Sequence, residues 1–102
     1  MSTNVAIVPA STSVWAATRM TALEERYAEA GLPVEIEAGP VGVVVYGPAR
    51  RVVESVCRAL VETVRDVDTH AVIDGGGEDR DESSATRFWA VVTFDWNKIG
   101  GV

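Results

Sequence analysis

The side chains of this chain that are best suited to catalysis or metal binding are those of a single cysteine and a single histidine. Cys57 lies on the apolar stripe of a helical pattern, so we expect a buried structural thiol rather than a nucleophile. His70 has no second histidine and no CxxC pair to join it, whereas a zinc site needs three or four nitrogen, sulfur or oxygen ligands. The sequence therefore predicts neither a zinc site nor cysteine-based catalysis.

A run of carboxylates between Asp74 and Ser84 is the second place where chemistry could occur. Clustered carboxylates can bind calcium, but this run lacks the alternating oxygens, central glycine and terminal glutamate of an EF-hand. Its three consecutive glycines and its charge predict a solvated, mobile hairpin loop, or a loop that becomes ordered against a neighbouring subunit. The carboxylates that we single out in this loop are Glu78, Asp79, Asp81 and Glu82.

Motifs for nucleotide binding or nucleophilic catalysis are not visible in the rest of the chain. The glycines between Gly39 and Gly47 lack both the lysine of a P-loop and the spacing of a dinucleotide-binding turn. No serine lies in a nucleophile elbow. We therefore predict no catalytic residue, no metal and no cofactor. A small enzyme would have to rely on His70 and an acidic neighbour.

The stretch 42–64 organises the predicted fold. Val43, Val44 and Val45 are consecutive β-branched residues, which is typical of a strand buried on both faces. Gly47-Pro48 ends that strand. Apolar residues then recur at helical spacing, which predicts an amphipathic helix from about Pro48 to about Asp66.

The remaining elements follow from shorter patterns. Strict alternation over residues 34–38 predicts a strand with one buried face, joined by a turn to the strand of valines. A helical stripe follows the capping residues Ser11–Ser13 and ends before Gly31. Further strands are expected at residues 4–8, 69–73 and 87–96, and residues 97–102 are expected to be a loose tail.

This order, β-α-β-β-α-β-β, predicts one α+β domain over residues 1–102. Its first six elements follow the ferredoxin-like plan, in which two helices cover one face of a mainly antiparallel sheet. The last two strands would pair across the acidic loop. The strand at 4–8 is the element with the weakest pattern, and without it the order is α-β-β-α-β-β.

Composition and charge narrow the classes of partner. The chain has 102 residues and a net charge of −6, with no basic stripe, so it lacks the electrostatic footprint of a nucleic-acid-binding protein. An anionic membrane surface would repel it, and no apolar run approaches the roughly 20 residues of a membrane helix. No signal peptide is visible. We expect a cytoplasmic protein, or part of an assembly formed in the cytoplasm.

Aromatic residues and arginines predict a contact surface. The chain has three tryptophans, and its valine-rich strand and its last strand are apolar on both faces. Such a small domain has no further element to cover the second face, so another copy of the chain is the expected cover. Two arginines in a first helical turn oppose the helix dipole, and they are either solvated or meet the acidic loop of a neighbouring subunit. The interface candidates are Trp15, Arg50, Arg51, Trp89 and Trp96.

Residues 34–96 resemble the tail terminator proteins of long-tailed phages, the lambda U-like group. The resemblance rests on a strand with the sequence VGVVVYG, a following helix, a charged loop (GEDRDE) and a closing aromatic strand (RFWAVVTFDW). That closing strand ends in threonine, an aromatic residue and an acidic residue, here Thr93, Phe94 and Asp95. Members of the family usually open with a helix, and the strand expected at 4–8 departs from that plan.

The resemblance implies a non-enzymatic structural protein of the virion tail. Such a protein forms a ring, hexameric in that family, which caps the tail tube, stops its growth and joins it to the head connector. An acidic lumen would not retain passing DNA, since it repels phosphate. Glu35 and Glu37, together with the acidic loop, are the candidate lumen or contact groups.

A rival prediction comes from a different class of protein. A dimeric ferredoxin-like module that binds a small ligand, or regulates a partner, where two sheets meet would also explain an apolar second face. The number of copies in solution distinguishes the two, because the module predicts a dimer and the terminator predicts a hexameric ring.

Overall fold

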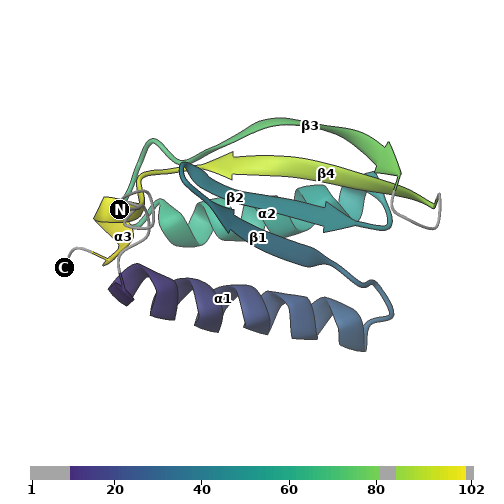
Figure 1. Cartoon of the computed structure of the whole chain (residues 1–102), viewed down its shortest axis with the longest axis horizontal. Coiled ribbons are helices and arrows are strands. Elements are labelled where there is room, and N and C mark those ends of the chain that lie inside the picture. The colour runs from purple at the N-terminus through teal and green to yellow at the C-terminus, as the bar shows by residue number, and fades with distance from the viewer. Residues whose placement is uncertain (1–9, 81–84, 101–102) are drawn as a thin grey trace, which may run out of the picture.

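The computed structural model describes residues 10–80 and 85–100, with side chains described for residues 18–80 and 85–99 (Figure 1). The strand expected at residues 4–8 lies outside the described residues. In chain order the elements are α1 (Ala10–Glu29), β1 (Glu35–Gly39), β2 (Gly42–Gly47), α2 (Arg50–Val64), β3 (Val72–Arg80), β4 (Thr86–Thr93) and α3 (Trp96–Gly100).

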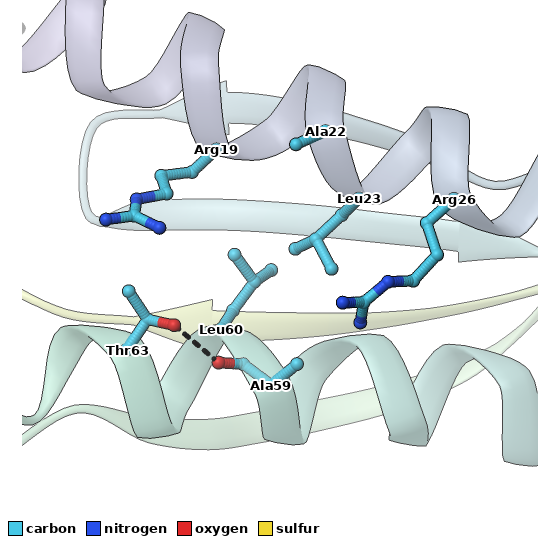
Figure 2. Close-up of a pocket in the computed structure, with 7 residues that line it drawn as sticks. All are labelled: Arg19, Ala22, Leu23, Arg26, Ala59, Leu60 and Thr63. Carbon is cyan, nitrogen blue, oxygen red and sulfur yellow. Dashed lines mark hydrogen bonds between the residues drawn. The ribbon is translucent and has the colours of Figure 1, made fainter.

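The four strands form one antiparallel sheet in the order β1-β2-β4-β3, so the predicted α+β class is confirmed. The predicted hairpin between the first two strands is β1–β2, in which Ile36 lies opposite Val45. Val45 in turn lies opposite Ala90 of β4. These three side chains are buried in one core with Met20 of α1, and both long helices cover this face of the sheet (Figures 1 and 2).

Helix α2 supplies the largest share of the core. Its apolar positions recur every three or four residues, so they form one stripe that points at the sheet. Val56, Cys57 and Val64 are fully buried, and Leu60 is 1% exposed. The helix begins after Ala49, whose backbone is extended, rather than at the predicted Pro48. The buried residues of α2 are Val52, Val53, Val56, Cys57, Leu60, Val61 and Val64.

The segment predicted as a mobile acidic loop is largely a strand, and this prediction was wrong for residues 74–80. Strand β3 continues through the glycines to Arg80 and pairs with β4, with a bulge between Ile73 and Gly76. The composition of this segment predicted a loop because the strand buries few of its own side chains. Its glycines instead allow close approach: a Cβ on Gly77 would lie 3.3 Å from the ring of Trp89, so the indole rests on bare backbone.

The expected loose tail is also wrong for residues 97–100, which belong to a helix, and the last strand ends before the predicted Trp96. Strand β4 ends at Thr93, and α3 begins three residues later at the end of the sheet, beside α1 (Figure 1). Trp96 and Ile99 are 3% and 8% exposed, because both pack into the core. The Trp96 indole N–H donates a 2.6 Å hydrogen bond to the Gly39 carbonyl, and its ring meets Phe94 edge to face. This corner therefore fastens the C-terminal segment to the β1–β2 turn.

Candidate functional site

The face of the sheet opposite the helices carries an apolar strip that no described element covers. Val44 and Tyr46 of β2 and Trp89 and Val91 of β4 are each half-buried, and the register sets Val44 beside Val91 and Tyr46 beside Trp89. We call these four residues the outer strip. They line a shallow hollow of about 330 Å³ together with Asp79. The predicted apolar second face is therefore present, and Trp89 is one of its residues.

Charged residues surround the outer strip. The Arg87 guanidinium lies 4.2 Å from the centroid of the Tyr46 ring, between the carboxylates of Glu35 and Asp79, each 3.7 Å away. The buried Nε of Arg87 has no hydrogen-bond partner among the described residues. Glu37 is exposed and lies opposite Val44 in the register. The two β1 glutamates thus form an acidic rim along one side of the strip.

The other interface candidates have different surroundings. Arg50 lies 3.9 Å from Glu78 of its own chain and 5.4 Å from the Phe88 ring centroid, so its charge already has an intramolecular partner. Both members of that ion pair are more than half exposed, which makes it weak. Arg51 is exposed, and its pairing with a neighbouring subunit stays a prediction.

Trp96 belongs to the core, so its place among the interface candidates was wrong. Trp15 lies in α1, but its side chain is outside the described residues, as are Asp81 and Glu82.

A groove between α1 and α2 is the feature that sequence reasoning missed. It encloses about 210 Å³, and Figure 2 shows the guanidinium groups of Arg19 and Arg26 at its two ends, with Leu23 and Leu60 between them. Seven residues separate the two arginines, which places them on one side of α1. The spacing was visible in the sequence, but the partner helix that turns it into a groove was not. The lining residues are Arg19, Ala22, Leu23, Arg26, Ala59, Leu60 and Thr63.

His70 is joined to its acidic neighbour Asp68 through a backbone hydrogen bond. The Asp68 carboxylate accepts hydrogen bonds from the backbone N–H groups of Asp95 (2.8 Å) and His70 (3.0 Å), and Lys98 lies 3.6 Å away. It is the backbone of His70, and not its imidazole, that makes this contact. The side chain of Asp68 is 3% exposed. Its two hydrogen bonds connect the turn after α2 to the segment before α3.

Those hydrogen bonds lower the pKa of Asp68, with the Asp95 N–H as the main cause. The carboxylate therefore stabilises the fold above the pKa that aspartate has in the unfolded chain, and this contribution is lost as pH falls through the lowered pKa. We expect Asp68→Asn to lower the urea unfolding midpoint at pH 7, and the gap to the parent protein to close at acidic pH. Urea titrations across a pH series measure this. Asp66→Asn, at an exposed position two residues earlier, is the control, and a pH-independent gap would contradict the prediction.

The Cys57 thiol is buried and is a poor nucleophile. Cys57 is fully buried, and burial, with a smaller effect of Glu54, raises the pKa of its thiol to about 11. At neutral pH the group is a protonated thiol, which is a poor nucleophile. Its role is to fill the core between α2 and the sheet.

The described residues contain no group of three or more His, Cys, Asp or Glu side chains able to hold a metal ion. Within residues 10–80 and 85–100, no helix has the length and apolar character to cross a membrane. Searches against protein-family models, curated proteins and solved structures returned no match.

Proposed function

We propose that this chain is a non-enzymatic structural protein that assembles with copies of itself into a ring, in the manner of a phage tail terminator. The observation that carries the proposal is the outer strip with Arg87 beside it, which brings tryptophan, tyrosine and arginine together on an uncovered sheet face. These residue types dominate the binding energy of protein interfaces. A monomer would leave them half exposed, whereas a second copy would bury them.

The resemblance to tail terminators gains support from where its segments lie. The segments VGVVVYG and RFWAVVTFDW include β2 and all of β4 except its first residue, and these strands are adjacent in the centre of the sheet. The outer strip comes entirely from these two segments. As a terminator, the ring would cap the tail tube, contact the head connector and belong to the virion after assembly in the host cytoplasm. The acidic rim of Glu35 and Glu37 would then face a neighbour or the lumen.

The mass of the protein in solution tests this proposal. Light scattering after size exclusion, at low and high protein concentration, should give a hexamer that negative-stain microscopy shows as annular particles. A protein that stays monomeric at the highest concentration would overturn the proposal of self-assembly. A tight dimer that does not change with concentration would favour the rival.

That rival, a dimeric module that binds a small ligand, keeps one supporting observation. The hollow on the outer strip has about 330 Å³, which is near the lower bound for small-molecule sites. Two such faces packed together would enclose it. Mass spectrometry under native conditions would then detect a dimer that carries a bound molecule.

A substitution in the outer strip provides the second prediction about assembly. We expect Val91→Glu to weaken assembly by about thirtyfold or more, because a carboxylate would have to be desolvated at the centre of the contact. Val41→Glu is the matched control, since Val41 is 61% exposed and lies in the turn outside the strip. Sedimentation velocity measures both, and circular dichroism verifies their folding. Equal assembly of the two variants would exclude the strip from the interface.

A further inference from the structure

We propose that the groove between α1 and α2 receives the acidic rim of the outer strip from a second copy of this chain. Arg19 and Arg26 of one copy would pair with Glu35 and Glu37 of the next. This inference deepens the proposed function, because it names the two surfaces that meet in the ring, and it rests on that function.

The groove is suited to an acidic partner. Arg19 and Arg26 are both exposed, and neither forms an ion pair with a described carboxylate. Other arginines also have no ion pair with a described carboxylate, namely Arg51, Arg58, Arg65 and Arg80. What distinguishes Arg19 and Arg26 is that both lie at the ends of one groove (Figure 2). Between them, Leu23 and Leu60 form an apolar floor (Figure 2). Its 210 Å³ is below the roughly 300 Å³ of ordinary small-molecule pockets, so a few protein side chains fit it better than a cofactor does.

The acidic rim is a matching counterpart. Glu35 and Glu37 are alternate residues of β1, so they point to the same face about 7 Å apart. The two arginines stand about 10 Å apart along the axis of α1, and their long side chains can close the difference. Beside the glutamates lie Tyr46 and Val44, by register. Each surface therefore combines two like charges with an apolar strip, and the signs are opposite.

A second copy can contact β1 through its side chains but not through its backbone. The Glu24 carboxylate accepts a 2.8 Å hydrogen bond from the Ile36 backbone N–H, so α1 already caps this edge. A second copy cannot extend the sheet there without breaking that bond. The outward-pointing Glu35 and Glu37 remain available, since the Glu35–Arg87 pair is at 3.7 Å and Glu35 is 68% exposed.

The position of the two surfaces decides the symmetry of the assembly. The groove lies in the helix layer, and the outer strip lies on the opposite face of the sheet. A contact between them joins different patches on the two copies and cannot close as a twofold dimer. Such head-to-tail contacts produce rings when the rotation closes. A contact between two outer strips would instead produce a dimer.

Charge exchange tests the contact. One variant carries Arg19→Glu and Arg26→Glu, and the other carries Glu35→Arg and Glu37→Arg. We expect each variant alone to assemble at least about tenfold more weakly than the parent, since like charges then face each other. An equimolar mixture should regain assembly, because every contact in an alternating ring is again between opposite charges. Arg58→Glu with Arg80→Glu is the control for the first variant, as it makes the same change in net charge at exposed positions outside both surfaces.

The outcomes separate this inference from the proposed function. If the parent protein does not assemble, the proposed function fails. If the parent assembles and the Arg19 and Arg26 variant assembles equally well, the groove is not the contact, and the ring proposal stands. Failure of the mixture to recover, when both variants retain the parent's circular dichroism and urea midpoint, also overturns the inference. Recovery in the mixture alone supports it.

Discussion

Alanine in place of Gly42 is expected to destabilise the protein by more than about 4 kcal/mol, a large part of the roughly 5–15 kcal/mol by which a domain of this size is stable. Gly42 has φ +148°, a conformation that L side chains rarely adopt. An added Cβ would overlap the backbone oxygen of Val92 and lie 2.9 Å from the Thr93 Cα. Both neighbours are backbone atoms of the central strand β4, so neither can move away cheaply.

The same turn contains the matched control for that substitution. Gly39 pairs with Gly42 at the end of the β1–β2 hairpin, and the nearest atom to a Cβ at Gly39 is 3.9 Å away. We expect Gly39→Ala to change the free energy of unfolding by no more than about 0.5 kcal/mol. Urea denaturation followed by circular dichroism compares the two variants. Similar stability of both would show that the hairpin does not approach β4 as closely as the structure has it.

The parts of the fold that were predictable are those in which one local pattern decides. The valine strand β2, the amphipathic α2 and the alternating β1 each have a period that their burial requires. Residues 74–80 of β3 were not predictable as a strand, because their stability comes from the pairing partner β4 and not from their own side chains. Acidic residues and glycines signal a loop unless a tryptophan across the ladder needs bare backbone beside it.

The candidate surfaces also include residues that a local sequence pattern predicts and residues that it does not. Trp89 was found because its strand alternates, and the face opposite the core followed directly from the core residues. Arg19 and Arg26 were missed because a groove belongs to two helices, and the distance between helices is not encoded in the spacing of either one. Arg50 was predicted either to be solvated or to meet the acidic loop of a neighbouring subunit, because a cation in a first helical turn opposes the helix dipole. In the structure that loop is largely a strand, and Arg50 pairs with Glu78 of its own chain.

Substitution of Trp96 is expected to lower the free energy of unfolding by a large amount. It was a candidate for the interface, and the structure buries it at the end of the sheet. We expect Trp96→Ala to cost about 3–5 kcal/mol of unfolding free energy, because a large buried ring is removed and a cavity remains. Trp96→Phe should cost less, since it retains an aromatic ring beside Phe94 but loses the N–H that bonds to Gly39. Urea denaturation of dilute, monomeric protein measures both losses.

A role for Trp96 at the interface between copies predicts a different effect of the same substitution. If its ring belonged to the contact between copies, Trp96→Ala would leave the dilute monomer as stable as the parent and would only weaken assembly. A core residue lowers the urea midpoint of the monomer whether or not copies associate, because its partners Phe94 and Gly39 belong to the same chain. Val91→Glu should show the reverse, with an intact monomer and weakened assembly. The two variants together therefore separate the residues that hold the C-terminal corner in place from those that the outer strip presents to a neighbour.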